Sequence, residues 1–243
     1  MGKIFAVGIG PGDERYMTNA AVKAIEASDV LCGYTAYIDL VKDRYPDKQM
    51  YSTPMTKEKE RCVWAIERAR EGMTVSVVCS GDAGVYGMAG LLLEIMGTDT
   101  TIDFEVVPGI TAALSGAALL GAPLMNDFCV ISLSDLLTPW DMIEKRIRAA
   151  AQSDFAVVLY NPASHKRTDH LRRACDIFLT YRDPYNACGW VRNIGRGNEE
   201  KGVLTLKSLR DYEADMFTTV FIASSAADIV GGRIVTKRGY SIK

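Results

Sequence analysis

Several signals that mark common protein classes are missing from this sequence of 243 residues. No apolar run reaches the length of a membrane span, and Met1 to Ile4 lead directly into a strand pattern instead of a charged segment and an apolar signal core. The formal net charge is only −2, so the chain has no general attraction for a phosphate backbone. We therefore expect a cytoplasmic protein without a membrane or nucleic-acid partner.

Residue patterns typical of metal binding and of nucleophilic catalysis are also absent. The six cysteines are scattered without a C-x-x-C pair, and several fall within apolar runs, which is typical of buried reduced thiols. The two histidines, His165 and His170, lie five positions apart on a basic segment that we expect to form a solvated helix. The sequence therefore predicts no metal site, and it offers no nucleophile triad.

The glycine-rich loops lack the spacing of the common nucleotide-binding motifs. In the loop that starts at Gly8, Asp13 stands where a dinucleotide fingerprint needs its third glycine, and Pro11 stiffens the turn. No acidic residue ends a second strand as that fingerprint requires, and no G-K-[ST] follows a glycine-rich loop. These differences argue against a Rossmann dinucleotide site and against a P-loop.

The chain does have an alternation of apolar strand runs and helical patterns along its length, with 48% hydrophobic residues to build a core. The predicted strands are 4–9, 29–32, 73–78, 102–107, 128–133, 155–160, 187–191, 203–206 and 218–223. The predicted helices are 17–27, 34–45, 57–70, 85–96, one beginning at 111, 139–152 and a basic one after 164. The alternation predicts an α/β fold, and the apolar run 73–78 is typical of a strand covered on both faces in a parallel sheet. Because Gly121-Ala122-Pro123 interrupts it, we expect two α/β domains, 1–121 and 124–243.

Two strand-to-helix loops carry small residues that let a ligand approach the backbone. Gly81 and Gly84 lie in the loop after the third strand, and the free amides at the start of the next helix favour an electron-rich partner. Gly109 closes the fourth strand, and Thr111 is a candidate cap for the helix that follows. An ordinary connection and tight helix packing explain the two loops equally simply, so the local pattern leaves both interpretations open.

Five motifs, in the order found here, resemble those of the tetrapyrrole methyltransferase superfamily, and the similarity spans nearly the whole chain. They are Gly8-Ile9-Gly10-Pro11-Gly12-Asp13, Ser80-Gly81-Asp82-Ala83-Gly84-Val85-Tyr86-Gly87, Pro108-Gly109-Ile110-Thr111-Ala112-Ala113, Tyr160-Asn161-Pro162 and Arg192-Asn193-Ile194-Gly195-Arg196. Each motif is modest alone, and the ordered set is specific. Most relatives have proline where this chain has Ala83. That variant, together with residues 132–140, resembles the branch that methylates C-17 of precorrin-3B or cobalt-factor III, the ring-contracting step of cobalamin synthesis.

The resemblance implies two α/β domains that form a cleft, with S-adenosylmethionine in the cleft, and usually a homodimer. S-adenosylhomocysteine would be the product of the methyl donor, and the tetrapyrrole would lie across the cleft facing the donor methyl. The cofactor contacts that it implies, position by position, are Gly10, Pro11, Gly81, Asp82, Ala83, Gly84, Val85, Thr111, Ala112, Tyr160 and Asn161.

Methyl transfer from a sulfonium to carbon requires mainly alignment and exclusion of water, which suits a chain without a nucleophile triad. The carboxylate arms of a tetrapyrrole need cationic partners, and Arg192, Arg196 and Arg167 follow the ends of predicted strands. A solvated surface is the alternative for Arg167, and it is the interpretation we favour for Lys166. Asp135 is our candidate catalytic residue for ring contraction. For Asp82, a role in cofactor binding or helix capping is simpler than catalysis.

Three functions are open from the sequence alone. The first is C-17 methylation with ring contraction. The second is another reaction of the same superfamily, such as modification of ribosomal RNA or of a protein histidine derivative, although the mildly acidic charge argues against RNA. The third is non-catalytic binding of a tetrapyrrole. The sequence also leaves open whether the substrate carries cobalt.

Overall fold

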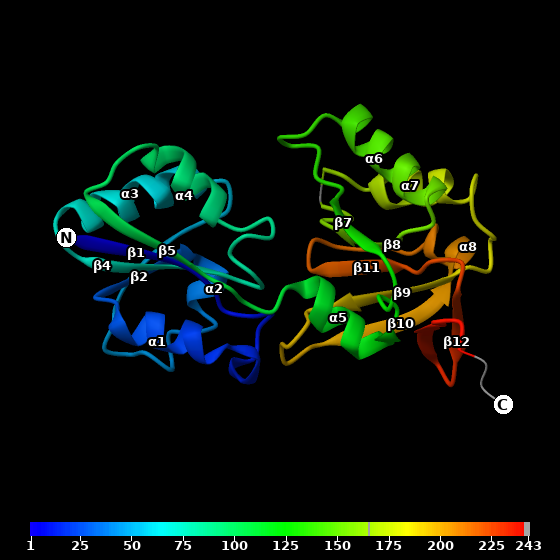
Figure 1. Cartoon of the computed structure of the whole chain (residues 1–243), viewed down its shortest axis with the longest axis horizontal. Coiled ribbons are helices and arrows are strands. Elements are labelled where there is room, and N and C mark those ends of the chain that lie inside the picture. Colours follow the sequence, from blue (N-terminus) through cyan, green and yellow to red (C-terminus); the bar gives the residue numbers. More distant parts are fainter. Residues whose placement is uncertain (165, 241–243) are drawn as a thin grey trace. The chain divides into compact units, whose positions relative to one another are not determined.

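A computed structural model describes residues 1–164 and 166–240, and the chain forms two compact units, 1–112 and 113–243. Both units consist of a sheet packed against helices, so the predicted α/β fold class is confirmed (Figure 1). All nine predicted strands are present. Within the described residues, no helix combines the length and the apolar character needed to cross a bilayer.

The first unit contains five strands and the helices that cover them. Its elements are β1 (Gly2–Gly8), the 3-10 helix η1 (Glu14–Tyr16), α1 (Asn19–Ala27), β2 (Val30–Tyr34), α2 (Thr35–Ile38), β3 (Gln49–Thr53), α3 (Glu58–Arg70), β4 (Thr74–Cys79), α4 (Ala89–Met96) and β5 (Ile102–Val107). The sheet order is β3-β2-β4-β1-β5, and every neighbouring pair is parallel. Two buried clusters cover its faces, one formed with α1 and α2 and the other with α3 and α4. Burial on both faces explains the near-continuous apolar strands.

Three local features of the first unit differ from the sequence prediction. The helix expected over 34–45 is only the short α2, which is followed by turns. The edge strand β3 was not predicted, because its pattern of partly exposed residues is not the apolar run of a central strand. The helix expected from Val85 begins only at Ala89, since Tyr86 takes a positive φ of 53° and the backbone N–H of Ala89 donates to the carbonyl of Ala83.

The second unit contains a mixed five-stranded sheet and a small third sheet. Its elements are α5 (Ala112–Leu120), β6 (Gly121–Ala122), β7 (Phe128–Ser132), α6 (Trp140–Gln152), β8 (Ala156–Tyr160), α7 (His170–Phe178), β9 (Ala187–Arg192), β10 (Glu200–Thr205), α8 (Leu206–Leu209), β11 (Thr218–Ile222), β12 (Ala227–Val230) and β13 (Arg233–Thr236). The larger sheet has the order β10-β9-β11-β8-β7, and the smaller one has the order β12-β13-β6.

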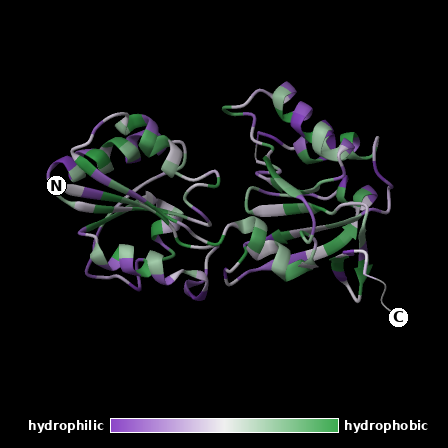
Figure 2. Cartoon of the chain, viewed as in Figure 1, coloured by the Kyte–Doolittle hydropathy of each residue, from purple (hydrophilic) through white to green (hydrophobic). Residues whose placement is uncertain are grey.

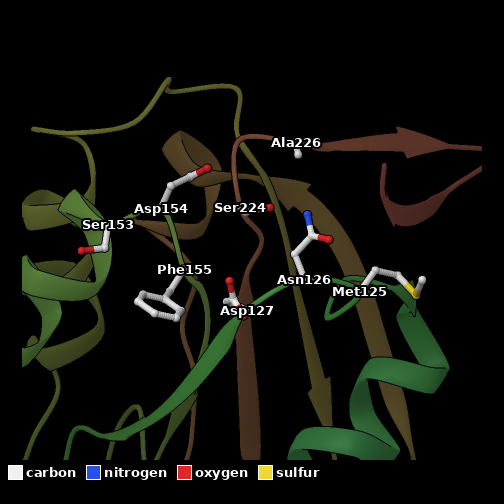
Figure 3. Close-up of a pocket in the computed structure, with 8 residues that line it drawn as sticks. All are labelled: Met125, Asn126, Asp127, Ser153, Asp154, Phe155, Ser224 and Ala226. Carbon is white, nitrogen blue, oxygen red and sulfur yellow. The ribbon is translucent and has the colours of Figure 1, made fainter. Parts of the chain in front are cut away.

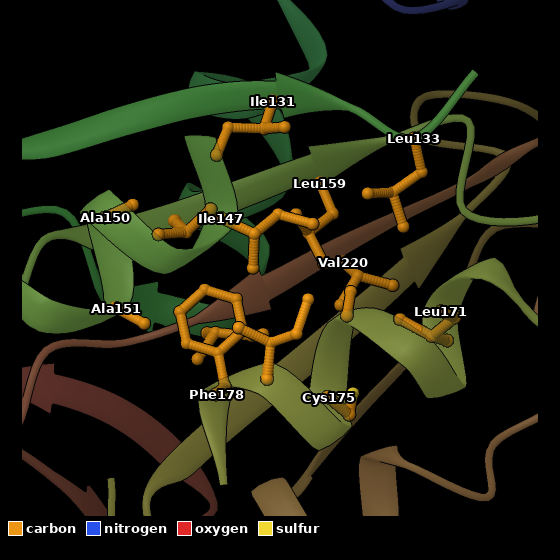
Figure 4. Packing of buried hydrophobic residues seen from close by; sticks show 14 of the residues in the cluster. Ile131, Leu133, Ile147, Ala150, Ala151, Leu159, Leu171, Cys175, Phe178 and Val220 are labelled. Carbon is orange, nitrogen blue, oxygen red and sulfur yellow. The ribbon is translucent and has the colours of Figure 1, made fainter. Parts of the chain in front are cut away.

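The core of the second unit lies between its larger sheet and the helices α6, α7 and α8. Figure 4 shows the ring of Phe178, from α7, among side chains of α6 and of the strands. On the other face of the sheet, α5 packs so closely that a Cβ at Gly116 would lie 2.7 Å from the ring of Phe221. In Figure 2, hydrophobic residues run along the strands, whereas the helices carry both hydrophobic and hydrophilic faces.

Residues 121–123, the predicted linker, are partly built into the second unit. Gly121 and Ala122 form β6 and pair in parallel with Ile234 and Val235 of β13. Helix α5 also packs within this unit, so the structural division falls at 112/113, nine residues before the end of the predicted first domain. The hairpin of β12 and β13 was not predicted, because its strands have only four residues each and β12 is mostly exposed.

Candidate functional site

The first unit has a topological switch point at the carboxyl ends of β1 and β4. These strands are hydrogen-bonded neighbours, and they end level because Gly8 pairs with Cys79. The chain leaves β1 toward α1 and leaves β4 toward α4, which lie on opposite faces of the sheet (Figure 1). Loops that diverge in this way leave a crevice at the sheet edge, where ligands bind in open α/β folds.

The two glycine loops that the sequence singled out meet at this switch point. The N–H of Gly10 donates to the carbonyl of Gly81 at 3.1 Å, and the N–H of Gly81 donates back to the carbonyl of Gly10 at 2.7 Å. Gly81 has a φ of +74°, and a Cβ built on it would lie no closer than 3.7 Å to its nearest neighbours, Thr111 Cα at 3.7 Å and Ala112 N at 3.8 Å. Cofactor contacts predicted from three separate loops are therefore brought together around one bare stretch of backbone.

Asp82 ties these loops to one another through its carboxylate. Its Oδ1 accepts hydrogen bonds from the N–H groups of Gly84, at 2.8 Å, and Val85, at 3.1 Å. Its Oδ2 accepts one from the N–H of Gly109, at 2.9 Å, in the loop after β5. Since α4 starts only at Ala89, Asp82 shapes the loop instead of capping a helix at Val85.

Replacing Asp82 by alanine is expected to destabilise the chain by about 2 kcal/mol, because hydrogen bonds to a charged group contribute roughly 1.5–3 kcal/mol each and water can reach part of this loop. The affinity for S-adenosylmethionine should fall as well, because the loops lose their common anchor. Urea unfolding and calorimetric titration measure the two effects. Asp43→Ala, at an exposed carboxylate of the same unit, is the control and should stay within about 0.5 kcal/mol of the parent. An Asp82→Ala protein with parental stability and affinity would contradict this role.

In the second unit, three parallel strand ends also gather predicted site residues at one edge. β7 and β8 are parallel, and β9 runs in the same direction because both β8 and β9 are antiparallel to β11. Their carboxyl ends carry Ser132, Tyr160 and Arg192. The same edge therefore receives the loops with Asp135, with Asn161 and Arg167, and with Arg196.

Tyr160 and Asn161 hold the end of β8 in place. The hydroxyl of Tyr160 accepts a hydrogen bond of 2.7 Å from the N–H of Ala113, in the first turn of α5. Asn161 has a φ of +52°, a conformation that asparagine adopts more readily than most residues, and its Nδ2 donates to Ser132 Oγ at 2.9 Å. The loops after β7 and β8 are thus linked by side chains.

Asp135, Arg167 and His170 form a charged cluster beside these loops. Asp135 Oδ2 lies 3.0 Å from His170 Nε2, and Asp135 Oδ1 lies 3.8 Å from Arg167 Nε. The pKa of the Asp135 carboxyl is lowered, first by its contact with His170 and less by Arg167. The expectation that His170 sits on a solvated helix face was wrong, because only 5% of this residue is exposed.

His170 could have been found from the helical period of its own segment. With Leu171, Ala174 and Phe178 it forms the buried face of α7, and the basic residues that suggested a solvated helix point elsewhere. His165 lies outside the described residues, and Lys166 is exposed. Among residues 1–164 and 166–240, no group of three or more His, Cys, Asp or Glu side chains is arranged to hold a metal ion.

The two arginines at the end of β9 and just beyond it differ in their surroundings. Arg192 Nε donates to Asp215 Oδ2 at 2.7 Å, and its Nη1 lies 3.6 Å from Glu200. Arg196 stacks over the ring of Phe217, with 5.6 Å between the guanidinium and the ring centre. A carboxylate ligand therefore has to compete with two protein carboxylates for Arg192. These partners could not be read from the sequence, because Glu200 begins β10 and Asp215 and Phe217 lie in the loop before β11.

A cavity of about 590 Å³ lies away from these predicted residues, at the opposite edge of the second sheet (Figure 3). It is lined by Met125, Asn126, Asp127, Ser153, Asp154, Phe155, Ser224 and Ala226. Asp154 in its wall accepts hydrogen bonds from the N–H and the hydroxyl of Ser225. The strand ends described above give better candidates, because they offer bare backbone in the first unit and charged groups in the second.

Comparison with known proteins gives a consistent result over the whole chain. The model of the family described as "Tetrapyrrole (Corrin/Porphyrin) Methylases" matches residues 3–210. A "Probable cobalt-factor III C(17)-methyltransferase" of Salmonella typhimurium is 45% identical, over 97% of this chain and 98% of that protein. A "Cobalt-factor III methyltransferase" of Priestia megaterium is 44% identical over 100% of this chain, which spans only 46% of that longer relative. The crystal structure of "the methyltransferase CobJ" is 34% identical, with a TM-score of 0.90 over 98% of this chain and all of that one.

Proposed function

Because the chain belongs to the family of tetrapyrrole (corrin/porphyrin) methylases, we propose that it transfers a methyl group from S-adenosylmethionine to C-17 of cobalt-factor III or precorrin-3B. The observation that carries the proposal is the full-length likeness to a relative named for this activity. Both relatives described above are named for cobalt-factor III, and we therefore place that substrate ahead of precorrin-3B. The ring contraction implied by the sequence motifs is part of the proposal.

The first unit offers a cradle that fits S-adenosylmethionine. The space beside Gly81, where a side chain would project, is bounded by the backbone of Thr111 and Ala112. We propose that Gly10, Pro11 and the loop from Gly81 to Val85 hold the cofactor there, while Tyr160 and Asn161 stay predicted contacts from the second unit. When bound, the sulfonium supplies an activated methyl group. The contribution of the chain is then orientation, which can lower a barrier by roughly 7–11 kcal/mol.

The tetrapyrrole is proposed to meet the carboxyl edge of the second sheet. Arg167, Arg192 and Arg196 are the predicted partners of its carboxylate arms, since guanidinium groups bind carboxylates with two parallel hydrogen bonds. Arg196 is the strongest of the three candidates for binding a substrate carboxylate, because its described neighbour is the ring of Phe217 and not a carboxylate. A homodimer, implied by the resemblance, and a cytoplasmic location, expected from the sequence patterns, also belong to this proposal, and sedimentation of the purified chain tests the dimer.

Incubation of the purified chain with S-adenosylmethionine and each tetrapyrrole tests the function directly. With cobalt-factor III, we expect a mass increase of one methyl group and the release of S-adenosylhomocysteine. Metal-free precorrin-3B, assayed in parallel, decides which of the two is the substrate. Tight pigment binding without a mass increase would instead support a non-catalytic carrier. If neither pigment is bound or methylated, another reaction of the same family becomes the better hypothesis.

A further inference from the structure

The contact between Asp135 and His170 joins an accessible carboxylate to a buried imidazole. Asp135 lies in the loop after β7, and 39% of its side chain is exposed. His170 is the first residue of α7, and only 7% of its side chain is exposed. Its Nε2 lies 3.0 Å from Asp135 Oδ2, and within the described part of the chain it makes no hydrogen bond of standard geometry. The buried imidazole therefore faces a carboxylate that solvent can reach.

The imidazole of His170 is held from two further sides. Its Nδ1 lies 3.1 Å from Asp169 Oδ1, within hydrogen-bond distance. The ring meets the indole of Trp140 edge to face, with 4.7 Å between the ring centres and 78° between the planes. Arg173 stacks on that indole at 4.0 Å. Because the ring is wedged between Asp169 and Trp140, its Nε2 edge is directed at Asp135.

Arg167 fixes the loop that carries Asp135. Its Nη1 donates to the carbonyl of Leu133 and to the carbonyl of Asn161, both at 3.2 Å. Its Nε stands 3.8 Å from the Oδ1 of Asp135. The two oxygens of Asp135 therefore face two different basic side chains, one from α7 and one from the loop before it, while the carboxylate remains open to solvent.

Methylation of a neutral ring carbon creates a need for a base. The new carbon–carbon bond uses an electron pair of the ring, the pair of the broken sulfur–carbon bond stays on sulfur, and the macrocycle is left with a positive charge. Loss of one proton from the macrocycle, whose bonding pair stays in the ring, restores neutrality. A carboxylate near the substrate can accept that proton and release it to water.

We propose that Asp135 is this base and that His170 is a positioning residue, which aims the carboxylate and keeps an imidazole nitrogen beside it. The inference rests on the proposed function and adds a step to it. In this step Asp135 accepts the proton that the macrocycle loses. The buried His170 then does more than fill space in the core, because it orients Asp135. Asp169, Arg167 and Trp140 are the groups that surround the pair.

The variants His170→Phe and His170→Gln separate positioning from packing. Phenylalanine keeps a ring but removes the imidazole nitrogen that faces Asp135, so the pKa of Asp135 should rise and the acid limb of the kcat profile should move to higher pH. Glutamine keeps a hydrogen-bond donor and should move the limb less. Turnover of either variant should recover when the pH is raised. Asp141→Asn, at an exposed carboxylate of α6, is the matched control and should leave the profile in place.

Asp135→Asn tests the base itself. Loss of a general base typically lowers turnover by about 10²–10⁴-fold, and the loss should persist at every pH. Adding His170→Phe to Asp135→Asn should cause no further loss, because the two residues act through one proton. An unmoved acid limb in both His170 variants, or parental turnover in Asp135→Asn, would overturn the inference.

Carbon-13 NMR of labelled aspartate in the free chain provides a reading that needs no activity. The Asp135 resonance, assigned through Asp135→Asn, should titrate below the usual aspartate range and move up in His170→Phe. An Asp135 titration that is the same in the parent and in His170→Phe would refute the pairing even if the enzyme is active. A parent chain that methylates no tetrapyrrole would refute the proposed function, while this titration would still report on the pair.

Discussion

Gly109→Val is expected to destabilise the first unit by about 3 kcal/mol, the upper end of the roughly 1–3 kcal/mol that overpacking usually costs. A Cβ at this position would lie 2.1 Å from the carbonyl oxygen of Gly81 and 2.6 Å from the backbone of Gly8. Backbone cannot rotate away as a side chain can, so the three loops would have to separate. The affinity for S-adenosylmethionine should fall at least about tenfold, which corresponds to about 1.4 kcal/mol. Urea unfolding and calorimetric titration measure both effects.

Gly90→Ala is the matched control for this substitution. Gly90 lies in α4, and a Cβ there would meet no atom within 4 Å. Alanine is a better helix former than glycine, so this variant should gain about 0.5–1 kcal/mol and keep its cofactor affinity. Parental stability and affinity in Gly109→Val would show that the strand-end loops are not packed as described.

Arg182→Met should destabilise the second unit by about 3–5 kcal/mol, because it removes three hydrogen bonds from a charged donor, and such bonds contribute roughly 1.5–3 kcal/mol each. Arg182 Nη1 donates to the carbonyl of Ala223 at 2.7 Å, and its Nη2 donates to the carbonyls of Ala150 and Phe155. Only 2% of the side chain is exposed, and this burial lowers the pKa of the guanidinium. Methionine has a similar length but supplies no donor. The midpoint of urea unfolding, followed by circular dichroism, gives the change.

Arg172→Met removes an arginine of the same unit from an exposed ion pair. Arg172 is 3.3 Å from Asp211, and more than half of each side chain is exposed. Such pairs contribute about 0–1 kcal/mol, so the control should remain close to the parent. If the two arginine variants unfolded at the same urea concentration, the carbonyl contacts of Arg182 would not be stabilising the unit.

The central strands could be predicted because burial on both faces leaves a direct mark on the sequence. Val75, Val77 and Val78 of β4 are almost completely buried, and their run of apolar residues indicates a covered parallel strand. β3 and the β12–β13 hairpin left no such mark, because edge strands and small sheets keep polar and exposed residues. The short α2 was overestimated, since a helical pattern does not show where neighbouring loops end a helix.

The candidate site also has a part that the sequence predicts and a part that it does not. Gly81, Asp82, Asp135 and Asn161 stand next to strand ends, and strand ends can be read from the sequence. The partners that define their roles cannot. Asp82 is bound by the N–H of Gly109, 27 positions away, and Asp135 meets His170, which the basic residues around it made look solvated.

The sequence by itself determined the α/β class, the places where strands end and the family, because apolar periodicity and short motifs are local properties. Only the tertiary structure decided that α5 and residues 121–122 build the second unit, that Asp82 fastens two loops, and that a buried histidine faces Asp135. Those relations depend on which distant strands lie side by side, and the spacing of residues along one chain does not contain that information.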